Sequence, residues 1–217
     1  MSAAPAADAS AAVRGVVFDL GGVLLRLADP LALFELEVTE AEFHALWLRS
    51  KSVREFERGA IDAQSFAESV VRELALPMPP ARFRERFDAW PQALFPDTLA
   101  LLEAIPAGVQ RVLLSNTNAA HWGRPDISGA LTGSFDLAFL SYRTGILKPD
   151  RAAFAQVAHA CRCAPRELLF FDDNPGNIAA AREFGMRAHL VKGPTDARAV
   201  LDAALPGGVR GAGPGAR

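Results

Sequence analysis

The sequence predicts an α/β protein with a doubly wound parallel sheet and a small inserted helical cap. Strand-like apolar runs alternate with helix-like segments along most of the chain, an order typical of parallel sheets. Three of the runs stop abruptly at a polar side chain, at Asp19, Ser115 and Asp172. Such residues stand at the carboxyl ends of parallel strands, where α/β proteins place their reactive groups.

Length and composition limit the classes of protein that the chain can belong to. With 217 residues, 50% of them hydrophobic, the chain can bury one substantial core and carry a small insertion. The formal net charge of −2 gives no basic excess, so we expect no nucleic-acid partner. Charged residues interrupt every helix-like region before about 18 apolar residues accumulate, so we expect no membrane span.

The cysteines predict a cytoplasmic protein, and the composition of the two ends of the chain predicts disordered termini. Cys161 and Cys163 are too few for a disulfide framework and are interpreted as free thiols in a reducing cytosol. Residues 1–12 are rich in Ala and lack the basic start and long apolar core of a signal peptide. We expect them, and the Gly-rich and Pro-rich residues 206–217, to be disordered.

The first predicted strand covers residues 13–19. Its residues are mostly β-branched or aromatic and show little alternation, as in a strand buried on both faces. Gly21 and Gly22 then permit a tight turn directly after the carboxylate of Asp19.

A helical block follows, and we interpret it as a cap over residues 30–95. No convincing strand falls between about residues 30 and 90. Thr39 and Glu42 have the spacing of a capping box, and a further helix opens at residues 61–66 with apolar residues at helical spacing after it. Because this block separates the first strand from the rest of the sheet, it is expected to form a module of its own.

Strands and helices alternate after the cap and complete a core domain of residues 13–29 and 96–205. Right-handed strand–helix–strand connections favour a parallel sheet with helices on both faces. The expected strands cover residues 110–115, 135–140, 168–171 and 187–191, and the expected helices cover residues 98–105, 151–161 and 178–184.

Asp19 is the candidate nucleophile. Its carboxylate is expected at the sheet edge, with backbone N–H groups of the glycine turn close by. Those N–H groups can hold phosphate oxygens while the carboxylate attacks phosphorus and forms an acyl phosphate. The alternative is a carboxylate that only caps the following turn.

Three further residues are candidates for binding an anion. Ser115 and Asn116 end the second long apolar run, where a hydroxyl and an amide can donate to one phosphate; both residue types are also common helix N-caps. Lys148 precedes Pro149, which is expected to open a helix, and a helix N-terminus favours anions. A solvated surface lysine is the alternative for Lys148.

Asp172 and Asp173 are candidate metal ligands. They follow a run of apolar residues at a predicted strand end. Two adjacent carboxylates repel each other there unless a cation offsets their charge, and ligands that are all oxygen favour Mg²⁺. The sequence therefore predicts Mg²⁺ as cofactor.

Taken together, these motifs resemble those of the haloacid dehalogenase-like hydrolase superfamily. The resemblance covers residues 13–191 and implies a Rossmann-like core with a cap inserted after the first motif. The four matching motifs, in order, are Phe18 to Val23, Ser115-Asn116, Lys148-Pro149, and Asp172-Asp173 with Asn177. Residues 56–59, 114–118 and 171–178 resemble, more narrowly, the bacterial subgroup that includes the glucose-1-phosphate phosphatases, and this subgroup is similar to the N-terminal phosphatase domain of soluble epoxide hydrolases.

The resemblance implies a role for each matching residue. Asp19 is the implied nucleophile and a Mg²⁺ ligand, together with the backbone carbonyl of Gly21. Ser115 and Lys148 are implied to bind the phosphoryl group that is transferred, beside Asn116 as a further candidate for binding phosphate. Asp172 and Asp173 complete the metal site. The implied protein is a Mg²⁺-dependent phosphatase, a monomer or homodimer, that hydrolyses a small sugar phosphate or related monoester through an aspartyl phosphate.

Gly21 departs from the superfamily pattern. Most phosphatases of this superfamily carry a second Asp at this position, which protonates the leaving alkoxide and later activates water. Gly21 has no proton to give, so either a water, a cap residue or an acidic leaving group substitutes for it, or the chain turns over slowly or not at all. A sugar 1-phosphate has such a leaving group, and the subgroup also tends to carry Gly here.

Two other functions compete with a phosphatase. A 2-haloacid dehalogenase uses the same Asp nucleophile without a metal, but its fourth motif typically lacks the adjacent acidic pair. A catalytically idle domain that only binds phosphate is favoured by Gly21 alone. Substrate-reading residues are less defined; the candidates are His121 and Trp122 after the second motif, and His44, Glu57 and Arg58 in the cap.

Overall fold

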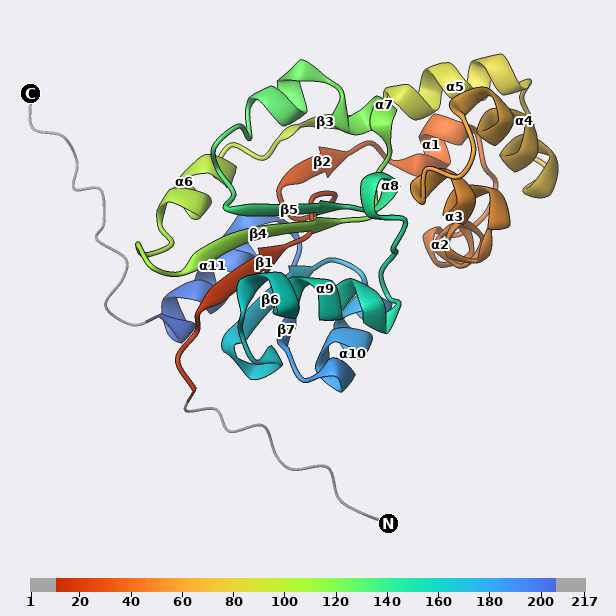
Figure 1. Cartoon of the computed structure of the whole chain (residues 1–217). Helices are drawn as coiled ribbons and strands as arrows, with labels where there is room; N and C mark the ends of the chain where they lie inside the picture. The colour runs from red at the N-terminus through yellow and green to blue at the C-terminus, as the bar shows by residue number, and fades with distance from the viewer. Residues whose placement is uncertain (1–10, 206–217) are drawn as a thin grey trace, which may run out of the picture.

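A five-stranded parallel sheet forms the centre of the computed structural model, which describes residues 11–205 (Figure 1). The strand order is β5-β4-β1-β6-β7, so the chain starts in the middle of the sheet and extends it in both directions. The predicted doubly wound parallel fold is therefore confirmed. The strands lie close to their predicted bounds: β1 (Gly15–Phe18), β4 (Gln110–Ser115), β5 (Leu137–Leu140), β6 (Leu168–Asp172) and β7 (Arg187–Leu190).

Helices cover both faces of the sheet, and each face has its own apolar cluster. Successive strand side chains point to opposite faces, so Phe18 packs in one cluster and Val17 in the other. Both are fully buried, which explains why the strands are apolar throughout. Helices α6 (Thr98–Glu103) and α11 (Gly193–Ala204) pack in the first cluster, and α9 (Arg151–Cys161) and α10 (Pro175–Phe184) pack in the second.

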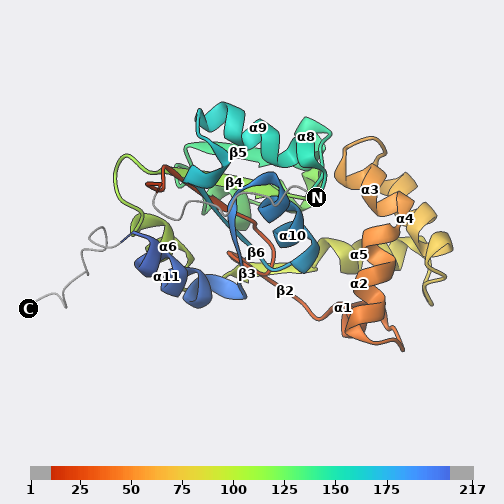
Figure 2. The same cartoon turned by 90° about the horizontal axis from the view of Figure 1, so that it is seen from below.

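Five helices between β2 and β3 gather at one end of the sheet (Figures 1 and 2). They pack around an apolar cluster of their own, which is mainly aromatic. Phe56 and Phe66 stack at its centre with ring centroids 4.2 Å apart. The helices are α1 (Pro30–Phe34), α2 (Glu40–Arg49), α3 (Lys51–Glu57), α4 (Ala63–Glu73) and α5 (Pro80–Asp88).

The local signals for two of these helices act as the sequence predicts. Thr39 caps α2 through the predicted capping box: its Oγ1 accepts from the Glu42 N–H at 3.3 Å, and its own N–H donates to Glu42 Oε2 at 2.8 Å. Asp62 caps α4 by accepting from the Ser65 N–H at 2.7 Å. Capping satisfies backbone donors that the first helical turn leaves unpaired.

A short antiparallel ribbon joins the five helices to the core, and the sequence does not predict it. Strands β2 (Leu25–Leu27) and β3 (Pro91–Leu94) pair where the chain leaves the core and where it returns. The ribbon continues through Ala28, whose carbonyl accepts from the Trp90 indole N–H at 3.1 Å. Strands this short carry no clear periodicity, so only their pairing identifies them.

The predicted disordered residues 1–12 and 206–217 lie outside the described residues, apart from Ala11 and Ala12; the Ala11 carbonyl accepts a hydrogen bond from Arg187. Within residues 11–205, no helix is both long and apolar enough to span a bilayer. Cys161 and Cys163 are buried free thiols.

We predict that Phe66→Ala loosens the five cap helices while the sheet stays intact, because Phe66 packs only in the cap cluster. Removing a buried aromatic ring costs about 3–5 kcal/mol. Hydrogen exchange should accelerate in α2 to α5 and remain slow in β4 and β6. Phe154→Ala, which empties an equally buried site under the sheet, should give the opposite pattern. Equal acceleration everywhere in both variants would contradict a division into cap and core.

Candidate active site

Three adjacent strands bring the polar residues of the sequence motifs together. β1 lies between β4 and β6, and Phe18 is in register with Leu113 and Phe171. Asp19 follows β1, and its N–H donates to the Phe171 carbonyl at 2.9 Å, so its side chain emerges beside Asp172 at the end of β6. Parallel strands run in one direction, so their carboxyl ends meet at one edge.

Lys148 is buried between two of these carboxylates. Its Nζ lies 2.6 Å from Asp19 Oδ1 and 2.6 Å from Asp172 Oδ2, and its side chain is 1% exposed. A buried ammonium group is tolerated only when opposite charges and hydrogen bonds replace its hydration. Lys148 is therefore an internal ion-pair partner, and the alternative of a solvated surface lysine is excluded.

Asn116 holds the backbone of Lys148 in place. Its Oδ1 accepts from the Lys148 N–H at 2.9 Å, and its Nδ2 donates to the Lys148 carbonyl at 2.9 Å. This reciprocal pair joins the end of β4 to the segment before α9. The helix-cap role considered for Asn116 belongs instead to Asn118, whose Oδ1 accepts from the His121 N–H at the start of α7 (Ala119–Trp122).

Asp172 is fixed from several sides and is fully buried. Asn177 Nδ2 donates to both of its oxygens, at 3.0 and 3.1 Å, and the Asn174 N–H donates to Oδ1 at 2.8 Å. Asn174 also caps α10, so the same residue positions the start of this helix and the carboxylate of Asp172. These hydrogen bonds fix the orientation of the Asp172 carboxyl group beside Lys148.

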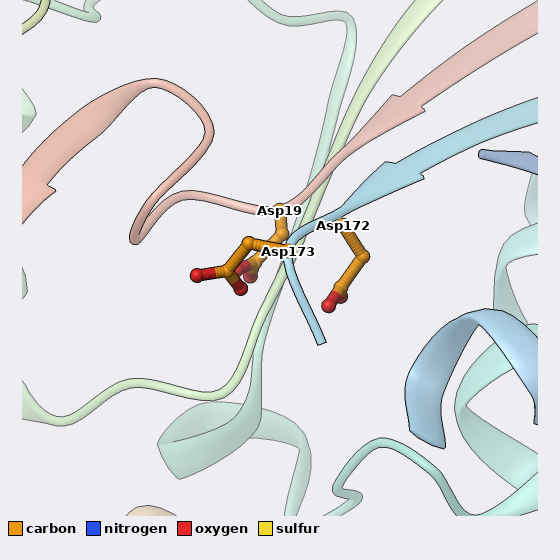
Figure 3. A group of neighbouring side chains, drawn as sticks. All are labelled: Asp19, Asp172 and Asp173. Atoms are coloured by element: carbon orange, nitrogen blue, oxygen red, sulfur yellow. The ribbon is translucent and has the colours of Figure 1, made fainter. Parts of the chain in front are cut away.

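Asp173 brings a third carboxylate to the same place (Figure 3). One oxygen from each of Asp19, Asp172 and Asp173 lies within 4.8 Å of the others. The turn after Asp19 has to pass close to Asp173: Gly22 has φ +71°, and a Cβ on it would lie 2.1 Å from Asp173 Oδ2. Only glycine fits both the backbone conformation and this approach.

The charges at the site favour a divalent cation. Burial, together with Asp172 and Asp173, raises the pKa of Asp19 to about 7 against the effect of Lys148. Burial and Asp172 likewise raise the pKa of Asp173 to about 6. Burial alone would lower the pKa of Lys148, but Asp172 and Asp19 raise it overall. Three carboxylates face one ammonium group, and an all-oxygen donor set fits a hard cation such as Mg²⁺.

A cavity of about 810 Å³ opens above these residues, between the core and the five cap helices. Its floor includes Asp19, Gly21, Ser115 and Asp173, whereas Lys148 and Asp172 do not line it. Its walls combine polar side chains with aromatic ones, and Phe43, Trp47, Phe87 and Trp90 line it from the side of the five helices. A volume of this size accommodates a small molecule.

The candidate substrate-reading residues divide into two groups. His44, Glu57 and His121 line the cavity. The His121 ring stacks on the Phe87 ring with centroids 4.3 Å apart, and its Nε2 donates to the Phe87 carbonyl at 2.8 Å. Burial lowers the pKa of His121 to about 4, so its imidazole is neutral. Trp122 packs against the core and Arg58 pairs with Asp150, and neither lines the cavity.

Sequence reasoning missed most of the cavity wall and the support beneath the site. Thr117 N–H donates to Ser141 Oγ at 2.9 Å, and Ser141 Oγ donates to the Thr117 carbonyl at 3.0 Å. Such pairs join segments far apart along the chain, and no local pattern indicates them. The aromatic wall residues have ordinary helical spacing, which predicts burial and not which of them also faces a cavity.

The fold and the site are those of an α/β enzyme whose reactive groups stand at the carboxyl ends of parallel strands beneath a helical cap. Residues 13–185 match the family of haloacid dehalogenase-like hydrolases. The chain belongs to this family.

Individual relatives are more distant. The chain is 33% identical over 92 residues to the GMP/IMP nucleotidase YrfG of Escherichia coli (strain K12), a match that spans 42% of the chain and 41% of the nucleotidase. It is 26% identical over 176 residues to the sesquiterpene phosphatase astK of Aspergillus oryzae, over 80% of the chain and 87% of that protein. The magnesium complex of the HAD family enzyme BT-2542 from Bacteroides thetaiotaomicron has a TM-score of 0.65 at 22% identity, covering 84% and 94% of the two chains.

We predict that Gly22→Ala is more destabilising than Gly145→Ala, although both glycines have φ +71°. A Cβ at Gly145 meets no atom within 4 Å, so that variant loses only the roughly 1–2 kcal/mol of a left-handed backbone. Gly22→Ala must also displace Asp173, which adds about 1–3 kcal/mol. Urea unfolding of the two variants measures the difference, and equal losses would show that Asp173 does not constrain the turn.

Proposed function

We propose that the protein is a Mg²⁺-dependent phosphatase that hydrolyses a small phosphate monoester through an aspartyl phosphate on Asp19. The observation that carries this proposal is the buried ion pair of Lys148 with Asp19 and Asp172, next to a cavity that Asp19 lines. The ion pair fixes one carboxylate oxygen of Asp19, which leaves the other to attack phosphorus. The names of the nucleotidase and phosphatase relatives support the same reaction class.

Asp19, Asp173 and the Gly21 carbonyl are the proposed direct ligands of Mg²⁺. Asp173 lines the cavity, whereas both oxygens of Asp172 already accept hydrogen bonds and Lys148 bonds to one of them. Asp172 therefore acts mainly by fixing Lys148 and adding negative charge to the metal site. When bound, Mg²⁺ offsets charge between the Asp19 carboxylate and the phosphate dianion, and so permits their approach.

Ser115, Asn116 and Lys148 are proposed to bind the phosphoryl group in different ways. Ser115 lines the cavity at the end of β4, where its hydroxyl can donate to a phosphate oxygen. Lys148 supplies positive charge from beneath. Asn116 acts through Lys148, because both polar ends of its amide side chain already bond the Lys148 backbone.

The cap, residues 30–95, is proposed to select the substrate that the core, residues 13–29 and 96–205, dephosphorylates. Aromatic side chains such as those of Trp47 and Trp90 line the cavity and suit a sugar ring, and His44 also lines it and can bind hydroxyl groups. We therefore retain a sugar phosphate as the proposed substrate. We also propose that the enzyme acts in the cytoplasm, as a monomer or homodimer, where its thiols stay reduced.

A metal-independent 2-haloacid dehalogenase is less well supported. That reaction needs no cation, so it gives no reason to gather three carboxylates around one ammonium group. An idle phosphate-binding domain has only Gly21 in its favour.

We expect wild-type protein to release inorganic phosphate from esters in a panel of glucose 1-phosphate, glucose 6-phosphate and GMP, with Mg²⁺ present. EDTA should abolish release, and Asp19→Asn should lower it by about 10³-fold or more, because the amide is a poor nucleophile. Circular dichroism controls for folding of the variant. Chloride release from 2-chloropropionate in the presence of EDTA, without phosphate release from any ester, would instead establish the dehalogenase.

A further inference from the structure

The proposed reaction needs a proton donor that Gly21 cannot provide. When the bond between phosphorus and the leaving oxygen breaks, an alkoxide forms unless a proton reaches it. A Cβ on Gly21 would lie 3.2 Å from the Leu27 Cδ1 atom, so an apolar side chain occupies the space beside it. Asp19, Asp172 and Asp173 are committed to Lys148 and to the proposed metal.

Glu57 is the cap carboxylate at this site. It is the last residue of α3, and it lines the cavity together with Asp19 and Ser115. Asp19 and Lys148 are close enough to influence its ionisation. Among the hydrogen bonds and ion pairs of residues 11–205, none engages its carboxyl group, which is therefore free to meet a ligand in the cavity.

Contacts between cap and core fix the position of Glu57. Arg58 Nη2 lies 3.0 Å from Asp150 Oδ2, and Arg54 Nη2 lies 3.6 Å from Asp150 Oδ1. Asp150 belongs to the segment that carries Lys148, so these pairs tie the end of α3 to the floor of the site. Figures 1 and 2 both show α3 next to α8 (Ser141–Thr144).

The turn after Glu57 is as constrained as the turn after Asp19. Gly59 has φ +72°, and a Cβ on it would lie 2.5 Å from the Tyr142 carbonyl oxygen in α8. The cap backbone thus touches the core backbone directly beside Glu57. A carboxyl group held in this way at the wall of the cavity is positioned in advance to meet a bound ester.

The surroundings of Glu57 suit a group that both gives and accepts a proton. Burial raises its pKa to about 7; Lys148 and Arg54 oppose the shift, and Asp19 adds to it. A carboxyl group with a pKa near neutrality is populated in both protonation states under physiological conditions, as general acid–base catalysis requires.

We propose that Glu57 is the general acid and base of the phosphatase, an inference that rests on the proposed function. As Asp19 bonds to phosphorus and the ester bond breaks, the Glu57 carboxyl group gives its proton to the leaving oxygen and an alcohol departs. The Glu57 carboxylate then takes a proton from the water that attacks phosphorus. Inorganic phosphate leaves, and both carboxyl groups return to their starting states.

The test compares Glu57→Gln, Glu57→Asp and the control Glu55→Gln. Glu55 lies on the same helix, pairs with Lys51 and does not line the cavity. Each variant is assayed on the alkyl esters that the wild type hydrolyses and on p-nitrophenyl phosphate, whose phenolate leaves without a proton. Thermal unfolding of each variant checks that the fold is intact.

We expect Glu57→Gln to hydrolyse alkyl esters about 10²- to 10⁴-fold more slowly. With p-nitrophenyl phosphate it should release one rapid equivalent of nitrophenolate and then turn over slowly. The second step is slow because hydrolysis of the aspartyl phosphate still needs the general base. Glu57→Asp should recover part of the alkyl ester rate, and Glu55→Gln should match the wild type.

Three outcomes would overturn the inference while leaving a phosphatase in place. They are equal rates for Glu57→Gln and Glu55→Gln, an equal slowing of both ester types without a burst, and wild-type activity confined to esters with acidic leaving groups. Wild-type protein that releases phosphate from no ester would overturn the proposed function as well.

Discussion

The buried ammonium group of Lys148 is the interaction on which the site depends. Without it, Asp19 and Asp172 would be carboxylates without a positive partner at the edge of an apolar sheet, and burying an unpaired charge is costly. Its position depends in turn on Asn116, which bonds both backbone groups of Lys148. Lys148 thus links the ends of β4, β1 and β6. These contacts are possible because the three strands are neighbours in the sheet.

The parts of this arrangement that the sequence predicts are those encoded locally. Apolar runs with a polar last residue give the strands and place Asp19, Ser115 and Asp172 at one edge, because parallel strands leave no other choice. The Thr39 capping box is equally local. What the sequence could not predict depends on pairing between distant segments: the ribbon of β2 and β3, the bonds from Asn116 to Lys148, and the aromatic wall of the cavity.

Two glycines illustrate the same limit. In the sequence, Gly21 and Gly22 both indicate a turn. In the structure, the surroundings of the two glycines differ. Gly22 adopts a left-handed backbone and passes directly against Asp173, so a side chain there would collide with the proposed metal site. Gly21 faces only the movable tip of Leu27, so sterics alone do not demand glycine. The absence of a side chain at Gly21 is therefore a chemical feature of the site more than a packing requirement.

Placing the proton donor on the cap changes what the cap does. An acid beside the nucleophile would stand on the same rigid strand end and be present whether or not a substrate filled the cavity. Glu57 stands on α3 instead, next to the contacts of Arg58 and Gly59 with Asp150 and Tyr142. Proton transfer then requires the same contacts that enclose the substrate. Catalysis and substrate selection become two consequences of one cap–core interface, which explains why an enzyme of this design can dispense with an acid at Gly21.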